Sequence, residues 1–262
     1  MLKFVVLSDL HLVDEGETSQ GLDTHARLQR GIEAINTRHA DADFCVLAGD
    51  LADLGHQGAV APYTRLKELV AGLTMPCHIT IGNHDNRDAY VSIFGEDERA
   101  ETGFIDKVID AKGYRVILLD SAEHGTHEGV LDAAQIDWLT ARLAEAADRP
   151  VVIVLHHHAN PLHTRVDRII LRDADRFLAA LKTHGDIRQV IAGHVHYTSC
   201  GLWYGIPFTT LAGGHYNVTV PLDPEAKVDR LFGPAQFAVV LGDEGQTLVH
   251  FDNYLDGNAV LS

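Results

Sequence analysis

Five short segments of the sequence combine residue types that bind metal ions in proteins. Each contains aspartate, histidine or asparagine, and each follows an apolar run. The segments are Ser8–His11, Gly49–Asp53, Gly82–Asp85, His156–His158 and Gly193–His196. Carboxylate, imidazole and amide oxygen are ligands of borderline ions such as Mn, Fe, Zn and Co. Each segment alone has an ordinary explanation as a turn, a cap or a solvated loop, but the five together predict a metal centre.

Asp50 is the residue around which we expect this centre to form. A short apolar strand predicted over 44–48 leads into Gly49, whose backbone freedom allows a sharp turn before the carboxylate. One carboxylate has two oxygens and can hold two ions roughly 3.5–4 Å apart. We therefore expect Asp50 to be shared between two metal ions.

The apolar runs before the five segments are predicted to be β-strands. They cover residues 4–7, 44–48, 77–81, 151–155 and 189–192. Helices are predicted between them from apolar spacing and from the caps Asp23 and Asp173. These helices cover about 24–37, 59–72, 132–147 and 174–185. In α/β proteins, strand ends that share one edge of a sheet build functional sites, so this alternation explains why the candidate ligands would meet.

The pattern changes to strands alone after His196. A hairpin is predicted over 103–119, and the later strands over about 200–204, 207–211, 216–220, 235–241 and 247–251. Because the candidate ligands extend from position 9 to 196, we expect one domain over 1–262, with two packed sheets and helices outside. The stretch 221–234 has three prolines and mixed charge, which predicts a surface excursion that could serve as a lid or contact arm.

Composition limits the classes of partner. Of 262 residues, 46% are apolar, as in a globular protein with an ample core, and the net charge is −16. This acidic balance argues against binding to a nucleic acid polymer or an anionic membrane. Three scattered cysteines are too few for a disulfide framework, and no run resembles a signal peptide or a membrane span. We expect a cytoplasmic location, whereas the oligomeric state is not indicated.

The order of the motifs resembles that of the calcineurin-like metallophosphoesterase family. The motifs are Asp9-x-His11, Gly49-Asp50-x-x-Asp53, Gly82-Asn83-His84-Asp85, His156-His157 and Gly193-His194-x-His196. The segments Gly125–Gly129 and Leu171–Asp173 are similar to bacterial class III cyclic-nucleotide phosphodiesterases and to the related glycerophosphodiesterases. His158-Ala159 departs from these relatives, which usually have prolines there. The resemblance implies a four-layer α/β/β/α sandwich of two mixed sheets flanked by helices.

The resemblance also implies seven metal ligands divided between two sites. The first site would use Asp9, His11, Asp50 and His196, and the second Asp50, Asn83, His156 and His194. His156 is expected in preference to His157 because the family's ligand is the first of the pair. His157 and His158 would then lie behind the ligands or at the rim. Two cations at these sites would make a water acidic and neutralise the phosphoryl oxygens.

Further residues are candidates for contact with the substrate. The family implies that His84 contacts the phosphate or the leaving group, with Asp53 orienting it. His127, His215 and Tyr216 could line the substrate pocket, although each has a plain alternative as a loop residue. The predicted function is a metal-dependent phosphodiesterase for a small diester, with a 3′,5′-cyclic nucleotide favoured.

Four alternatives to this function stay open at the level of the sequence. Two are activities of the same class, on a glycerophosphodiester or on a phosphomonoester. The third is a non-catalytic scaffold of the same fold, but such a member should have lost ligands, and here all seven positions are filled. The fourth is a nuclease of the same superfamily, which the acidic balance and the lack of a basic groove disfavour.

Overall fold

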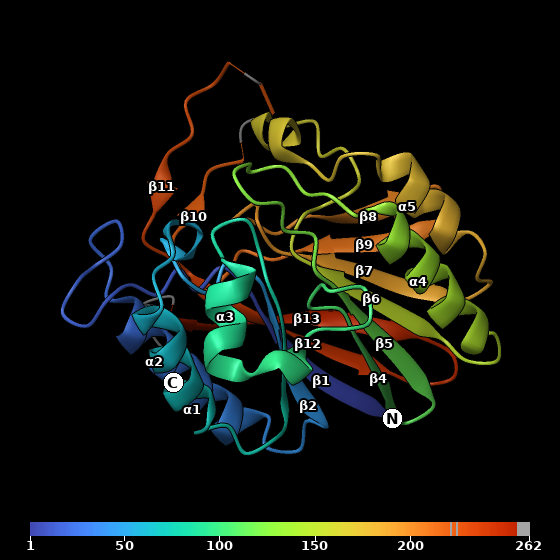
Figure 1. The fold of residues 1–262 in the computed structure, drawn as a ribbon, viewed down its shortest axis with the longest axis horizontal. Helices are drawn as coiled ribbons and strands as arrows, with labels where there is room; N and C mark the ends of the chain where they lie inside the picture. Colours follow the sequence, from blue (N-terminus) through green and yellow to red (C-terminus); the bar gives the residue numbers. More distant parts are fainter. Residues whose placement is uncertain (221, 224, 256–262) are drawn as a thin grey trace, which may run out of the picture.

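The computed structural model describes residues 1–220, 222–223 and 225–255, and two β-sheets form its centre (Figure 1). The first sheet has the strand order β13-β12-β1-β2-β3 and the second β4-β5-β6-β7-β9-β8. The first sheet comprises β1 (Leu2–Leu7), β2 (Phe44–Ala48), β3 (Cys77–Thr80), β12 (Ala235–Gly242) and β13 (Thr247–Leu255). The second comprises β4 (Lys107–Ala111), β5 (Tyr114–Leu119), β6 (Val151–Leu155), β7 (Ile187–Ala192), β8 (Cys200–Trp203) and β9 (Ile206–Thr210). A small separate pair joins β10 (Asn217–Val218) to β11 (Arg230–Leu231).

Helices cover the outer faces of both sheets, so the predicted four-layer sandwich is confirmed (Figure 1). The first sheet carries α1 (Thr24–Arg38), α2 (Ala61–Val70) and α3 (Arg87–Phe94), and the second carries α4 (Ala133–Glu145) and α5 (Ala174–Leu181). Short 3₁₀ helices are η1 (Gly55–Gln57), η2 (Glu96–Glu98) and η3 (Arg165–Ile169). None of the described helices is long and apolar enough to cross a membrane.

The alternation of side chains along β1 shows how the layers are held together. Phe4 and Val6 point into the cluster between the two sheets, whereas Val5 and Leu7 point into the cluster beneath α1–α3. Successive residues of a strand face opposite sides, so a strand covered on both faces is apolar throughout. This explains why the strands were recognisable as continuous apolar runs.

The register of the parallel strands brings the candidate ligands to one edge. In the first sheet Leu7 of β1 is the register partner of Leu47 of β2, which in turn pairs with Ile79 of β3. In the second sheet Leu155 of β6 pairs with Ala192 of β7. Because parallel strands point the same way, the segments that follow them emerge together.

Several local predictions need correction. The strand predicted over 216–220 is limited to β10, whose partner β11 lies inside the predicted excursion. Helix α3 was not predicted, although Asn86 caps it by accepting a hydrogen bond from Ala89 N. Asp173 precedes α5 but has a left-handed backbone with φ of 51° and makes no side-chain cap. The later strands do not form a separate half, since β12 and β13 extend the first sheet and β8 and β9 the second.

Candidate metal centre

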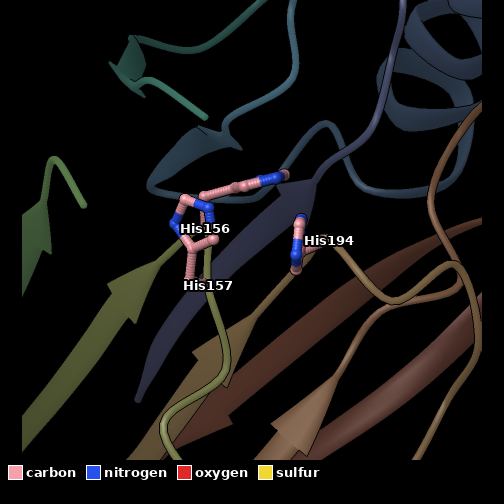
Figure 2. Close-up of side chains that lie close together, drawn as sticks. All are labelled: His156, His157 and His194. Atoms are coloured by element: carbon pink, nitrogen blue, oxygen red, sulfur yellow. The ribbon is translucent and has the colours of Figure 1, made fainter. Parts of the chain in front are cut away.

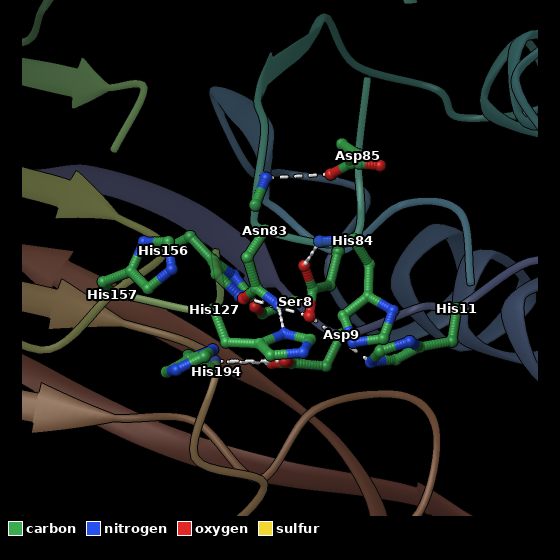
Figure 3. Close-up of polar contacts among 12 residues, drawn as sticks. Ser8, Asp9, His11, Asn83, His84, Asp85, His127, His156, His157 and His194 are labelled. Atoms are coloured by element: carbon green, nitrogen blue, oxygen red, sulfur yellow. Dashed lines mark hydrogen bonds and ion pairs between the residues drawn. The ribbon is translucent and has the colours of Figure 1, made fainter. Parts of the chain in front are cut away.

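The candidate metal centre lies at the junction of the two sheets, where the carboxyl ends of their parallel strands meet (Figure 3). Hydrogen bonds join the two sheets there. His194 N donates to Asp9 Oδ1 at 3.0 Å, and His156 Nδ1 donates to Ala48 O at 2.9 Å. Segments separated by more than a hundred residues therefore share this one edge.

Asp50 lies at the middle of the centre, and its two oxygens face different partners. Oδ1 accepts a hydrogen bond from His84 N at 2.9 Å. Oδ2 lies 3.6 Å from His11 Nε2 and 3.3 Å from His156 Nε2. The carboxylate thus stands between an imidazole that follows the first sheet and one that follows the second, which is the position of a bridging ligand.

Each predicted histidine ligand uses one ring nitrogen for a hydrogen bond and keeps the other free. The four pairs are His11 Nδ1 with Asp53 Oδ1 (3.0 Å), His156 Nδ1 with Ala48 O (2.9 Å), His194 Nε2 with Ile169 O (3.1 Å) and His196 Nδ1 with Tyr216 O (2.7 Å). Such partners fix the orientation of a ligating imidazole. The free Nε2 of His196 lies 3.5 Å from Asp9 Oδ1, so this ring faces the centre as well.

Three of the free atoms are buried without any hydrogen-bond partner. They are His11 Nε2, His156 Nε2 and Asn83 Oδ1. Leaving a buried polar atom unsatisfied costs about 1–3 kcal/mol, and a bound cation would satisfy it. The donors are nitrogen and oxygen atoms of the kinds that borderline metal ions prefer. Ligand atoms of Asp9, His11 and His196, and of Asp9, Asp50 and His156, lie within 4.8 Å of one another, so these residues fit the implied pair of ions.

The backbone is left-handed at five of the seven candidate ligands. The φ angles are 56° at Asp9, 46° at His11, 50° at Asp50, 72° at His194 and 57° at His196. The described part of the chain has ten such non-glycine residues, so half of them lie in this centre. A left-handed residue other than glycine costs of order 1–3 kcal/mol and persists only where its surroundings hold it. The concentration of strain here marks the centre as a functional site.

Two glycines permit the close packing of these turns. A Cβ atom at Gly82 would lie 2.4 Å from Asp50 Oδ1, and one at Gly193 would lie 1.9 Å from Ser8 Oγ. Real Cβ atoms do not approach heavy atoms this closely, so only glycine fits at either position. The glycines of the Gly82–Asp85 and Gly193–His196 segments are therefore required by contact with the other turns.

His84 lies beside the centre, and the structure corrects how Asp53 holds it. His84 Nδ1 donates to the main-chain oxygen of Asp53 at 2.7 Å, whereas the Asp53 carboxylate is 4.0 Å from the same nitrogen. The carboxylate instead accepts hydrogen bonds from His11 and from Ser19 Oγ. Asp53 therefore contacts His84 as expected, but the hydrogen bond that orients the ring is accepted by its carbonyl, and the carboxylate lies only at ion-pair distance. His84 Nε2 stays free to carry a proton.

His157 and His158 are not at the rim, since both are fully buried. Figure 2 shows His157 close to His156, with His194 across from them, and ligand atoms of all three lie within 4.8 Å of one another. His157 Nδ1 is hydrogen-bonded to Ser121 Oγ at 2.8 Å, which leaves Nε2 without a partner. His157 therefore lies beside two of the candidate ligands, and this proximity was not evident from the sequence.

The three candidate substrate contacts occupy different positions. His127 accepts a hydrogen bond from Asn83 Nδ2 at 3.0 Å, and its ring centroid is 5.8 Å from that of His84 (Figure 3). Tyr216 stacks on His196, with ring centroids 4.3 Å apart. His215 is 1% exposed and donates from Nε2 to a main-chain oxygen, and its ring lies 4.9 Å from that of His11, so the structure places it against the ligands.

Asp85 supports the centre, although the sequence motif alone did not assign it a role. Its buried carboxylate accepts hydrogen bonds from the main-chain nitrogens of Leu51, Ala52 and Gly82 and from the Tyr63 hydroxyl. Burial, together with the nearby charge of Asp50, raises the pKa of Asp85 to about 6. Asp85 joins the turn after β2 to the turn after β3. The position of Asp85 at the end of the Gly82–Asp85 motif was the signal in the sequence that could have indicated this supporting role.

Burial and neighbouring charges set the protonation of the clustered side chains. Burial lowers the pKa of His194 well below the usual value for histidine, and the imidazoles of His157 and His156 lower it further. Burial also opposes the charged form of His156, but Asp50 outweighs it and raises this pKa to about 9. Without metal, Asp50 and His156 form a charged pair, so metal ligation by His156 requires the loss of a proton.

Comparison with known proteins gives the same family as the motifs. The family model described as calcineurin-like phosphoesterase matches residues 2–198, which include all seven candidate ligands. A probable cyclic nucleotide phosphodiesterase of Rhodopseudomonas palustris is 32% identical over 95% of this chain and 91% of that protein. A cAMP/cGMP dual specificity phosphodiesterase of Mycobacterium tuberculosis is 33% identical over 80% of this chain and 66% of that protein.

Solved structures share the fold at lower identity. A dimetal phosphatase from Danio rerio has a TM-score of 0.73 at 17% identity, covering 97% of both chains. A purple acid phosphatase from yellow lupin has a TM-score of 0.64 at 12% identity, covering 99% of this chain and 52% of the other. The motif order, the sandwich and the family match agree, and the chain belongs to the calcineurin-like phosphoesterase family.

Proposed function

We propose that this protein is a dinuclear metal-dependent phosphodiesterase for a small diester, with a 3′,5′-cyclic nucleotide as the favoured substrate. The observation that carries the proposal is the position of Asp50 Oδ2 between the unpartnered Nε2 atoms of His11 and His156. In a scaffold that no longer binds metal, buried ring nitrogens without partners around a shared carboxylate would only be destabilising. The names of the relatives support the choice of a cyclic nucleotide.

The proposed ligands are those implied by the family resemblance. They are Asp9, His11, Asp50 and His196 for one ion, and Asp50, Asn83, His156 and His194 for the other. Mn, Fe, Zn and Co match this set of donors. When bound, two such ions neutralise charge on the phosphoryl oxygens and make a water acidic enough to attack near neutral pH.

The side chains of the protein itself supply orientation and a proton. The Asp53 carbonyl holds His84 Nδ1–H, so His84 Nε2 can donate a proton to the leaving oxygen of the diester. The Asp53 carboxylate orients the ring of His11 and acts on catalysis through that ligand. We assign His127 to contact with the substrate because its ring neighbours His84, and Tyr216 to the wall beside His196.

The setting of the enzyme is also part of the proposal. The three cysteines are free, which suits the reducing cytoplasm. We treat residues 1–262 as one domain, with 221–234 as a surface excursion and a lid or contact arm as its role. One contact of this excursion is an exposed ion pair between Glu225 and Arg168 of η3, 3.7 Å apart. The partner we propose is the small diester, not a nucleic acid polymer or a membrane.

A substrate panel tests the proposal. Metal-depleted protein is reconstituted with Mn, Co, Zn or Fe and assayed with cyclic nucleotides, glycerophosphodiesters and phosphomonoesters. We expect metal-dependent hydrolysis with the highest kcat/KM on a 3′,5′-cyclic nucleotide. A higher kcat/KM on a glycerophosphodiester or monoester would replace the substrate but keep the chemistry. Two bound ions without hydrolysis of any of these compounds would favour the scaffold.

A further inference from the structure

Arg27 of α1 is a buried arginine whose guanidinium donates to three main-chain oxygens. The residue is 5% exposed. Nε donates to Gly214 O at 2.9 Å, and one terminal nitrogen donates to His215 O at 2.6 Å and to Phe232 O at 3.1 Å. The guanidinium carbon also lies 5.2 Å from the centroid of the Phe232 ring. Arg27 therefore joins α1 to two segments that lie far along the chain.

Arg27 has this position although burying a cation is costly. Burial lowers the pKa of Arg27, and no carboxylate of the described residues forms an ion pair with it. A buried charge without an opposite partner must be compensated by hydrogen bonds, and here main-chain carbonyls provide them. A planar fork that reaches several acceptors at once is a property of arginine that neither lysine nor an apolar residue offers.

The segment that Arg27 holds, Gly213–Tyr216, is called here the backing loop because it lies against one half of the metal centre. Gly214 N donates to Ser8 O at 2.9 Å, and a Cβ atom at Gly213 would lie 2.8 Å from that of Asp9. Tyr216 O accepts the hydrogen bond that orients His196. The ring of His215 lies 4.9 Å from that of His11, measured between centroids. The backing loop thus contacts three candidate ligands of one ion.

We propose that Arg27 is a positioning residue for the metal half-site of Asp9, His11 and His196. Its guanidinium fixes the carbonyls of the backing loop, and that loop in turn sets the direction of the His196 ring. The contact with Phe232 couples the base of the 221–234 excursion to the same half-site. The inference rests on the proposed function, since it requires that the centre bind two ions.

Metal titration of three variants tests the inference. Arg27→Met removes the fork and keeps the volume apolar, and Arg27→Lys keeps the charge without the fork. Arg30→Met is the matched control, because Arg30 is exposed one turn later on α1 and lines the same cavity of about 1050 Å³ without donating to the backing loop. Metal-free proteins are titrated with Mn or Zn against a chromophoric chelator, and their thermal melting is recorded without metal.

We expect Arg27→Met to weaken one of the two binding steps by about 10–100-fold, the usual effect of removing a partner that orients a ligand. The other step should keep its affinity, Arg27→Lys should be intermediate, and Arg30→Met should resemble the wild type. A folded Arg27→Met with two unchanged steps would overturn the inference. Equal weakening of both steps would do the same, since it would show a general effect on the fold.

Two further outcomes are decided by the same experiment. If Arg27→Met does not fold, Arg27→Lys is judged by the same criteria, and failure of both to fold would assign Arg27 to stability alone and overturn the inference. A wild type that binds fewer than two ions would refute the proposed function itself. Two ions in the wild type with unchanged affinities in Arg27→Met would refute only the role of Arg27.

Discussion

Two clusters of buried carboxylates lie in this protein, and they differ in what their oxygens face. Asp106 and Asp120 pack beneath α3 and α4, and each of their four oxygens accepts two hydrogen bonds. The donors are Arg87, Ile105 N and Ala122 N for Asp120, and Thr102, Gln135 and Asp120 N for Asp106. This cluster is complete without any ligand, so it braces the fold.

The metal centre has the opposite character. Asp50 Oδ2 faces two ring nitrogens that have no hydrogen-bond partner, and Asn83 Oδ1 is buried without one. Buried polar groups are normally satisfied, so a group of unsatisfied atoms that converge needs an explanation. Burial of carboxylates alone therefore does not indicate a metal site. A metal site is indicated where buried ligand atoms converge and have no hydrogen-bond partner in the protein.

The largest expected effect is that of removing the shared carboxylate. Asp50→Ala should abolish the dinuclear centre and lower turnover by several orders of magnitude, because no other candidate residue is assigned to both ions. Metal content per chain and kcat/KM are the measurements. Asp120→Asn is the matched control in the satisfied cluster, and it should lose stability while it keeps both ions. Two ions with near-normal activity in Asp50→Ala would show that the ligands are wrongly assigned.

His84 tests the chemistry next to the metal centre. His84→Ala should keep both ions and lower kcat by about 10²–10⁴-fold, the usual contribution of a general acid or base. The loss should be larger for a ribose or alkyl diester than for a p-nitrophenyl diester, whose leaving group needs less help. Kinetics on both substrates and metal analysis of the variant are required. Equal losses would indicate phosphate positioning, and loss of an ion would make His84 a ligand.

The buried histidines after β6 sharpen the distinction between a ligand and its support. His156→Ala should lose one ion, whereas His157→Ala, which removes a ring that we assign to the support of the ligands, should weaken binding by about 10–100-fold at most. His158→Ala should have the smallest effect of the three, since the Nε2 atom of His158 faces Asp167 Oδ1 at 3.4 Å. Competition titration ranks the three. The assignment fails if His157→Ala is the variant that loses an ion.

The smallest effect is expected in the satisfied cluster. Burial, together with the nearby charge of Asp120, raises the pKa of Asp106 from the usual 3.8 to about 7. The folded protein then holds a proton that the unfolded chain releases between these pH values, so this group stabilises the fold as pH falls from about 7 toward 4. Asp106→Asn should remove this dependence.

The corresponding measurement is the difference in melting temperature between Asp106→Asn and the wild type, in metal-free protein from pH 5 to pH 8. The melting temperature of the variant should rise relative to that of the wild type as pH rises. In a separate metal titration, both proteins should bind two ions. A difference independent of pH would show that Asp106 titrates normally in the folded state. A change in metal binding would show that the two clusters are not independent.

Local signals in the sequence are enough to predict the strands and turns that deliver the site. Apolar runs that end in glycine, aspartate and histidine identify the strands, because a strand buried on both faces must be apolar and the turn after it must release a polar side chain. The same local signals placed Asp9, Asp50 and His194 at strand ends. The net charge also follows from the sequence alone, because it is a sum over residues, and its negative sign disfavours anionic partners.

Which atoms meet in the site depends on tertiary contacts that the local sequence does not encode. The assignment of β12 and β13 to one sheet and of β8 and β9 to the other depends on pairing between distant strands, which local periodicity does not encode. The same holds for the Asp53 carboxylate, which bonds to His11 and not to His84, and for the contacts of Arg27 with the backing loop. Hydrogen bonds at these buried positions are chosen by the packing of segments far apart in the chain, because each donor must find its partner inside the folded interior.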